Sequence, residues 1–150
     1  MKVGDKAKDF SLPDQDGRTH RLSEYRGRWV LLYFYPRDFT PGCTREARDF
    51  RDAWKEIRAA GLVVLGISRD SPERHRRFAE KEKLPFPLLS DPDARVHRLY
   101  GAWKEGPPAR ALRKSFLVDP TGRIAYVWEK VKPAGHAREV LEQLLKLQRR

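Results

Sequence analysis

The stretch that decides the fold reads Trp29-Val30-Leu31-Leu32-Tyr33-Phe34-Tyr35-Pro36-Arg37-Asp38-Phe39-Thr40-Pro41-Gly42-Cys43-Thr44-Arg45-Glu46. Its first seven residues are apolar on both faces, as in a central strand that is covered on both sides of a sheet. Pro36 ends that strand, because proline cannot donate a hydrogen bond to a neighbouring strand. From Cys43 to Ala60, apolar residues recur at intervals of three and four, which indicates a helix closed by Gly61. The stretch therefore predicts a buried strand that leads into a helix, with Cys43 at the start of the helix.

Further elements are predicted on both sides of this stretch. We expect a hairpin around the turn 14–17, a capped turn at 23–25, a buried strand at 62–67, a helix capped by Ser71 and Pro72, a short extended piece at 88–89, a helix at 93–100, a hairpin formed by 115–118 and 123–128, and a last helix around 140–145. The order βαβ followed by ββα is the thioredoxin plan. The sequence thus predicts one α/β domain over residues 1–150, with a thioredoxin-like fold, a central mixed sheet flanked by helices, and an N-terminal β-hairpin extension.

Cys43 is the only cysteine of the 150 residues, so no internal disulfide can form. Two interpretations compete for a lone cysteine. It can be an inert small hydrophobe in the core, or it can be a reactive thiolate. The N-terminus of a helix carries about half a positive charge and several unpaired N–H groups, which favour the thiolate.

The neighbours of Cys43 decide between these interpretations. The pattern Pro-x-x-x-Thr-x-x-Cys, occupied by Pro36, Thr40 and Cys43, resembles the active-site signature of the peroxiredoxins. The wider stretch 33–47 most resembles their bacterioferritin comigratory protein branch, also called the Q-type peroxiredoxins. The stretches 10–17, 64–72 and 113–122 fit the same branch, in order and without large insertions. The resemblance spans nearly the whole chain.

The resemblance implies a thiol peroxidase that reduces hydrogen peroxide and organic hydroperoxides. Cys43 is then the nucleophile and becomes a sulfenic acid. Thr40 stands where thioredoxin-like oxidoreductases have the first cysteine of Cys-x-x-Cys, so dithiol exchange within the motif is impossible, and it offers a short hydroxyl instead. The N–H groups of Gly42 and Cys43 point toward an anion in front of the helix, and Pro36 supplies a donor-free wall that shelters the sulfenate.

Two charged residues complete the implied site. Arg113 matches the family's distant arginine, whose guanidinium supports the thiolate and hydrogen-bonds the peroxide; the alternative is an ordinary surface arginine. Glu46 matches the family's helix acid, for which we expect a positioning role. An acid of the first helical turn, favoured by the helix dipole, is nearly as good an interpretation.

Other residue types that carry chemistry show no such motif. Tyr35 and Phe39 either line the pocket or belong to the core. The four histidines are far apart in the sequence and are interpreted as surface or structural residues. Since no metal-ligand spacing is found, neither a metal nor a cofactor is predicted.

Arg48 marks a departure from the family pattern. Many members of the branch carry a resolving cysteine five residues after the peroxidatic one, and that position is Arg48 here. The sequence therefore predicts a one-cysteine enzyme, whose sulfenic acid is reduced by an external thiol (thioredoxin, glutaredoxin or a low-molecular-weight thiol) or by another chain. A monomer or weak homodimer is expected. The segment 104–110 is also shorter than in many relatives, which bears on pocket width.

Composition narrows the classes of partner and location. The net charge is +11, but basic residues are spread along the chain among acids, which favours a solvated, salt-bridged surface over a nucleic-acid patch. The polar start Met1–Lys6 is not followed by an apolar segment, and the longest apolar run is too short to span a bilayer, so a cytoplasmic location without membrane contact is expected. The chain has no Asn, 3 Gln and 21 Arg, which fits either a thermophilic source or a GC-rich genome.

A second hypothesis comes from another class of protein. In it, the chain is a thioredoxin-fold redox sensor or binding protein, and oxidation of Cys43 is a signal with little turnover. Its only support is the missing resolving cysteine. The intact set of Pro36, Thr40, Cys43 and Arg113 favours the enzyme.

Overall fold

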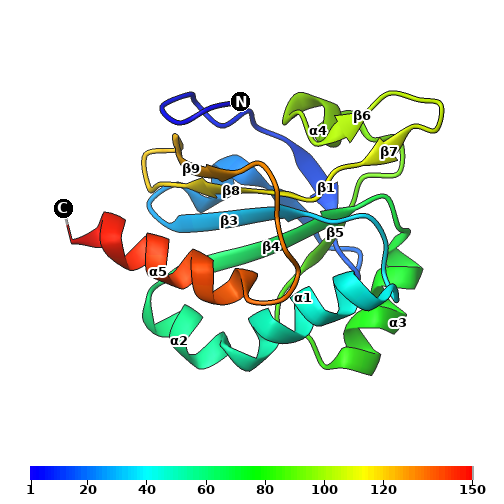
Figure 1. Ribbon diagram of the computed structural model, residues 1–150, viewed down its shortest axis with the longest axis horizontal. Coiled ribbons are helices and arrows are strands. Elements are labelled where there is room, and N and C mark those ends of the chain that lie inside the picture. The colour runs from blue at the N-terminus through cyan, green and yellow to red at the C-terminus, as the bar shows by residue number, and fades with distance from the viewer. Residues whose placement is uncertain (150) are drawn as a thin grey trace.

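The computed structural model describes residues 1–149, and a five-stranded mixed sheet lies at its centre (Figure 1). The strand order is β5-β4-β3-β8-β9. The central strand β3 (Trp29–Phe34) pairs in parallel with β4 (Leu62–Ser68), which pairs in parallel with β5 (Leu88–Ser90). On its other side β3 is antiparallel to β8 (Lys114–Val118), which is antiparallel to β9 (Ile124–Trp128). The predicted thioredoxin-like sheet is confirmed.

Each face of this sheet is covered by a layer of other elements. One face carries α1 (Pro41–Asp52), α2 (Trp54–Ala59), α3 (Pro72–Glu82) and α5 (His136–Gln148), which lie below the sheet in Figure 1. The opposite face carries the N-terminal hairpin of β1 (Ser11–Pro13) and β2 (Thr19–Arg21), the 3-10 turn η1 (Leu22–Tyr25) and α4 (Arg95–Leu99). The predicted N-terminal hairpin is therefore present.

The side chains of β3 alternate between two separate cores. Leu31 and Tyr33 belong to the core beneath α1, α2, α3 and α5, whereas Leu32 and Phe34 belong to the core beneath the hairpin and α4. Because successive residues of a strand point to opposite faces, a strand buried on both sides must be apolar at every position. This is why polar and apolar residues do not alternate in the run 29–35. Because β3 is held on both faces, the position of Cys43 beyond its carboxyl end is fixed as well.

Two predicted helices need correction, and one small hairpin was not predicted. The predicted helix 43–60 begins earlier, at Pro41, and is interrupted at Ala53, whose ψ of 10° separates α1 from α2. Alanine is the best helix former, so this break has no signal at the residue itself. It coincides with packing of Trp54 against Phe86, whose rings lie 5.7 Å apart.

The predicted helix 93–100 is shorter, because Ala94 adopts a left-handed conformation with φ 60° and α4 starts only at Arg95. A small hairpin of β6 (Trp103–Lys104) and β7 (Arg110–Ala111) was not predicted, since two-residue strands leave no periodicity to read.

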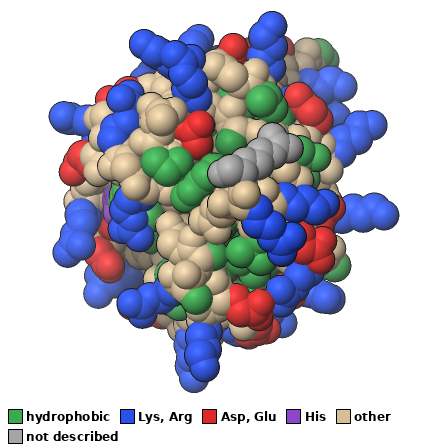
Figure 2. All heavy atoms as spheres, turned by 90° about the vertical axis from the view of Figure 1, so that its left-hand side faces the viewer, with side chains coloured by type: hydrophobic (Ala, Val, Ile, Leu, Met, Phe, Trp, Pro, Cys, Tyr) green, Lys and Arg blue, Asp and Glu red, His purple; other side chains and the backbone are tan. Residues whose placement is uncertain are grey.

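Charged side chains of both signs occur on one face of the molecule (Figure 2). On the face shown in Figure 2, which bears the end of α5, basic and acidic side chains are interspersed around the rim with uncharged surface between them. Within residues 1–149, no helix has the length and apolar character needed to cross a bilayer.

Candidate active site

Cys43 is the third residue of α1 and lies where the loop that follows β3 enters that helix. Pro41 occupies the first helical position, where a missing N–H costs nothing and a fixed φ suits the helix. The first helical hydrogen bond runs from the Thr44 N–H to the Thr40 carbonyl oxygen, 2.9 Å away. Cys43 is only 2 % exposed, so any reactant must approach through a defined opening.

Thr40 is the N-cap residue, yet its side chain does not cap the helix. Its hydroxyl donates to the Arg37 carbonyl oxygen at 2.7 Å, and no side-chain cap bond is made to α1. The N–H groups of Gly42 and Cys43 therefore have no capping oxygen from Thr40, and the positive end of the helix is directed at whatever lies in front of it. Thr40 Oγ1 keeps its lone pairs as acceptors, because its proton is already donated.

Arg113 reaches Cys43 from the residue before β8. Its Nη2 donates to Cys43 Sγ at 3.3 Å, and its Nη1 donates to Glu46 Oε1 at 2.6 Å. The side chain is only 18 % exposed. One guanidinium thus touches both the sulfur and the buried acid one helical turn away, and the geometry brings together three residues that the sequence resemblance had named.

Glu46 is fully buried, and this changes the pKa of its carboxyl group. Burial raises its pKa to about 7, although the neighbouring Arg113 acts in the opposite direction. Its Oε2 has no hydrogen-bond partner among the described residues, and neither has the hydroxyl of buried Tyr33. Burial, and next the charge of Glu46, raise the pKa of Tyr33 well above its ordinary value. The floor of the site is therefore a buried region in which charge is costly.

Gly42 lets the arginine come close to the helix. A Cβ at this position would lie 3.2 Å from Arg113 Nη2 and 3.3 Å from Cγ of Pro133. The sequence motif names this glycine, but Pro133 lies 91 residues away, and only the fold shows how little room a side chain would have.

Pro36, Thr40 and Arg113 line one cleft of about 720 Å³. Cys43 is not part of the wall, but Arg113 Nη2 lies 3.3 Å from its sulfur. Neither predicted aromatic forms part of its wall. Tyr35 is 1 % exposed within the core, and Phe39, which has a left-handed φ of 69°, packs edge-on against Phe78 at 5.1 Å. The core interpretation holds for Tyr35, and Phe39 braces the loop against α3.

A buried polar network that sequence reasoning missed holds the loop before Cys43. The Asp38 carboxylate accepts from the Tyr35 hydroxyl at 2.6 Å and from His75 Nδ1 at 2.5 Å, and His75 Nε2 lies 3.1 Å from the Leu89 carbonyl oxygen. Both ring nitrogens of His75 thus face an oxygen, one of Asp38 and one of Leu89. Asp38 and His75 are both 0 % exposed, so this hydrogen-bonded pair fastens the loop to α3 and β5 from inside.

The backbone of the same loop is held as well. The Asp38 N–H donates to Asp70 at 2.9 Å, and Arg74 Nη2 donates to the Asp38 carbonyl oxygen at 3.2 Å. Single ligand atoms of Asp38, Asp70 and His75 lie within 4.8 Å of one another, a spacing that a metal ion would accept. Each of the three groups is already engaged in hydrogen bonds, so the cluster is a loop anchor.

All four histidines are buried, so they are structural residues and not surface residues. His20 pairs with Asp14 at 2.7 Å and His97 pairs with Asp91 at 2.6 Å. His136 contacts the Ser115 hydroxyl at 2.8 Å, and burial lowers its pKa.

Arg48, at the position of the expected resolving cysteine, forms an ion pair between two helices. Its Nε donates to Glu82 Oε1 at 2.6 Å, at the end of α3, and its Nη2 donates to Oε2 at 3.3 Å. Arg51 adds a bond of 2.7 Å to the Glu82 carbonyl oxygen. The outer face of α1 is thus tied to α3 one turn beyond Cys43.

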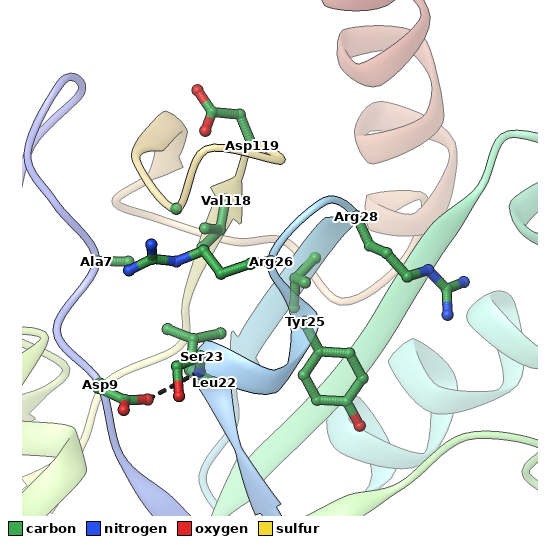
Figure 3. A pocket seen from close by; sticks show the side chains of 11 residues that line it. Ala7, Asp9, Leu22, Ser23, Tyr25, Arg26, Arg28, Val118 and Asp119 are labelled. Atoms are coloured by element: carbon green, nitrogen blue, oxygen red, sulfur yellow. Dashed lines mark hydrogen bonds between the residues drawn. The ribbon is translucent and has the colours of Figure 1, made fainter.

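A second hollow lies at the opposite end of β3, between Asp9, Ser23 and Asp119 (Figure 3). Its volume is about 20 Å³, which is room for roughly one water molecule. The length of β3 separates it from Cys43, so it is not part of the site.

Known proteins resemble this chain over almost its full length. A model of the AhpC/TSA family matches residues 3–127. Peroxiredoxin Bcp of Escherichia coli strain K12 is 46 % identical over 149 residues, which cover 96 % of this chain and 96 % of that protein.

Two solved structures are similar in fold and sequence. A mutant of PrxQ from Xylella fastidiosa aligns with a TM-score of 0.93 and 36 % identity over 100 % of this chain and 98 % of that chain. The bacterioferritin comigratory protein of Xanthomonas campestris, studied for its alkyl peroxide reduction activity, aligns with a TM-score of 0.87 and 37 % identity over 92 % of this chain and 91 % of that chain.

Proposed function

The chain belongs to the AhpC/TSA family and is a peroxiredoxin of the Bcp type, a thiol peroxidase, and from this premise we propose that Cys43 is its peroxidatic nucleophile. The observation that carries the proposal is the pair of bonds made by Arg113, to Cys43 Sγ at 3.3 Å and to Glu46 at 2.6 Å. A fixed guanidinium beside a sulfur at a helix N-terminus supports a thiolate and an attacked oxygen at once.

The peroxide step uses Cys43 and the polar groups around its sulfur. The Cys43 thiolate attacks one peroxide oxygen, the O–O bond breaks, and the other oxygen leaves as hydroxide or alkoxide while Cys43 becomes a sulfenic acid. Arg113 Nη2 and the uncapped N–H groups of α1 donate to the oxygens as charge develops. Thr40 Oγ1 accepts a hydrogen bond from the peroxide hydroxyl, since its own hydrogen is donated to the Arg37 carbonyl oxygen, and the attacked oxygen keeps its proton in the sulfenic acid.

The remaining site residues position these groups. Glu46 acts through Arg113, because it holds Nη1 and so directs Nη2 at the sulfur. Gly42 leaves room for that guanidinium, and Pro36 forms a donor-free wall of the cleft. The cleft is large enough for an organic hydroperoxide as well as hydrogen peroxide, so both are proposed as substrates.

Recycling needs a thiol from outside the chain, because Cys43 is the only cysteine. The cycle is a one-cysteine mechanism, in which the external thiol returns Cys43 from sulfenic acid to thiolate. The protein acts as a single domain of residues 1–150, either as a monomer or as a weak dimer. The bonds between Arg48 and Glu82 support a helix α1 that keeps its first turns folded in that state.

The test is Cys43→Ser in a single-turnover experiment. Reduced wild-type protein should consume one equivalent of hydrogen peroxide and gain one oxygen by mass, whereas the serine variant should consume none, because a hydroxyl is a far weaker nucleophile at neutral pH. An unchanged melting temperature of the variant shows that the fold is intact. Comparable peroxide consumption by the variant would overturn the assignment of Cys43.

The sensor hypothesis is separated by multiple turnovers. With excess peroxide and a thiol, an enzyme consumes many equivalents for each chain, whereas a sensor stops near one. The resemblance to peroxidases over 96 % of the chain favours turnover.

A further inference from the structure

The cleft lined by Pro36, Thr40 and Arg113 is strongly basic. Four of its ten lining residues are arginines: Arg37, Arg69, Arg110 and Arg113. Of these, Arg113 is engaged with Glu46 and the sulfur. The other three stand around the opening, which is wider than hydrogen peroxide requires.

The charges of these three arginines are not neutralised by acids. Arg37 and Arg110 are exposed and take part in no ion pair among residues 1–149. Arg69 donates to the Pro92 carbonyl oxygen at 3.1 Å and stacks over Trp103 at 5.1 Å, both of which leave its charge in place.

Asp70 is the only acid in the cleft wall, and it is already committed. Its carboxylate accepts from the Ser68 hydroxyl at 2.6 Å and pairs with Arg74 at 3.0 Å. The cleft therefore attracts anions, and several guanidinium groups are free to bind carboxylates or sulfonates.

The reductant must meet two conditions that the site sets. It has to bring a thiol, because the chain has no second cysteine. It also has to reach a sulfur that is 2 % exposed while α1 is held in place by Arg48 and Glu82. A small molecule that enters the cleft beside Arg113 needs less movement of the walls than a protein thiol does.

We propose that the cleft binds a low-molecular-weight thiol that carries carboxylate or similar anionic groups, and that this thiol is the resolving reductant. The proposal rests on the peroxidase function above and specifies its second substrate. Anionic groups pair with Arg37 and Arg110 at the rim while the thiol points inward to Cys43.

Reduction of the sulfenic acid back to the thiolate consumes two molecules of the thiol. The first attacks the sulfur of the Cys43 sulfenic acid; an S–S bond forms, the S–O bond breaks, and the leaving hydroxide takes up the thiol proton and departs as water. The second attacks the sulfur of the bound thiol, which leaves as the symmetric disulfide, and Cys43 returns as thiolate. Two thiol sulfurs are oxidised and the Cys43 sulfur is reduced.

The experiment compares thiols of different charge on protein first oxidised with one equivalent of hydrogen peroxide. The probes are 2-mercaptoethanesulfonate, 2-mercaptoethanol and cysteamine, with each rate of sulfenic acid loss corrected for the fraction of thiolate. In the wild type the anionic thiol should react fastest and the cationic thiol slowest, and the spread should shrink as salt is added.

Variants locate the effect. In Arg37→Gln/Arg110→Gln, the ratio of the anionic to the neutral thiol rate should fall about tenfold, because two exposed charge contacts are removed. Arg58→Gln removes one charge from exposed α2 and should keep the wild-type ratio. A wild-type ratio near one, or a ratio unchanged in the double variant, overturns the proposal.

The two proposals fail in different ways. If wild-type protein forms no sulfenic acid, the peroxidase assignment is wrong before any thiol is added. A parallel test uses a carboxylate-bearing hydroperoxide against hydrogen peroxide. If the double variant loses selectivity only for that peroxide and keeps its thiol ratio, the arginines serve the oxidising substrate and the thiol proposal is wrong.

Discussion

Helix α1 takes part in two arginine–glutamate pairs that have the same bond length and opposite electrostatic behaviour. Glu46 meets Arg113 at 2.6 Å, and Arg48 meets Glu82 at 2.6 Å. The pKa of Glu46 is raised to about 7, chiefly by burial. The pKa of Glu82 is lowered, chiefly by its hydrogen bond from Arg48.

The difference lies in the surroundings of each pair. Glu46 is 0 % exposed, and one of its oxygens has no partner among the described residues. The free energy that its carboxylate loses by desolvation therefore exceeds the favourable interaction with one guanidinium. Arg48 is 50 % exposed, so the pair that it forms with Glu82 keeps contact with solvent. The first pair positions a charge at the chemistry, and the second fastens two helices.

The two pairs therefore act on stability in opposite directions of pH. A carboxyl with a raised pKa binds more protons when folded than when unfolded, so stability falls as the pH rises from 4.5 to about 7. Glu82, with a lowered pKa, contributes stability that is present above its unfolded pKa and is lost as the pH falls through its folded pKa.

Arg113→Ala should have the largest effect, because it removes the group that Glu46 positions. We expect the rate of the peroxide step to fall by about 10²–10³-fold, the usual loss when a preorganised donor to the transition state is removed. Stopped-flow tryptophan fluorescence on mixing reduced protein with peroxide gives the rate. Arg48→Ala is the matched control, and it should keep a peroxide rate within a fewfold of the wild type.

Equal losses in the two alanine variants would contradict the distinction between the two pairs. Arg113→Lys separates charge from geometry. A single ammonium cannot reach Glu46 and Cys43 along two directions as the guanidinium does, so lysine should restore little of the rate.

Glu46→Gln tests the pH dependence directly. The neutral amide should leave stability near the wild-type value at pH 5 and raise it at pH 8, by about 3 kcal/mol at most, which is the cost of ionising a group whose pKa has moved from 4.5 to about 7. Urea unfolding at the two pH values measures this. A variant that is less stable than the wild type at pH 8 would show that the ion pair outweighs burial.

Gly42→Ala should separate activity from stability. The new methyl group meets the end of the Arg113 side chain at 3.2 Å and a ring carbon of Pro133 at 3.3 Å. A shift of the guanidinium by a few tenths of an ångström should slow the peroxide step about tenfold. The melting temperature should change little, because alanine favours the helix while the contact opposes it. A wild-type rate would show that the guanidinium has room to move.

Much of the fold was readable from the sequence because it depends on local patterns. The doubly buried strand, the proline at its end, Ser71 as a helix cap and Gly61 as a helix end each leave a signal at the residue itself. Ser71 accepts from the Arg74 N–H at 3.2 Å, and Gly61 has the left-handed φ of 74° that glycine favours.

What the sequence could not supply depends on distant contacts. The hydrogen bond between Asp38 and His75 joins residues that are 37 positions apart, and the break at Ala53 coincides with packing of Trp54 against Phe86. The acceptor role of Thr40 rests on a single bond to Arg37. The residues of the candidate site were named through resemblance, whereas their orientation required the fold.

Arg48→Ala should give the smallest effect and sharpen the comparison from its other side. An ion pair with one half-exposed partner is screened by solvent, and Arg51 still donates to the Glu82 carbonyl oxygen and lies near its carboxylate. We expect a small fall in melting temperature at pH 7 that shrinks with added salt and disappears once Glu82 is protonated. The clearer change should appear in hydrogen exchange of the amides from 43 to 48 after oxidation. In the wild type this turn should stay protected, because no internal disulfide draws it open, and in the variant it should exchange faster. A variant with unchanged protection would mean that the core beneath α1 holds the turn alone, and that the arginine only fills the position of a missing cysteine.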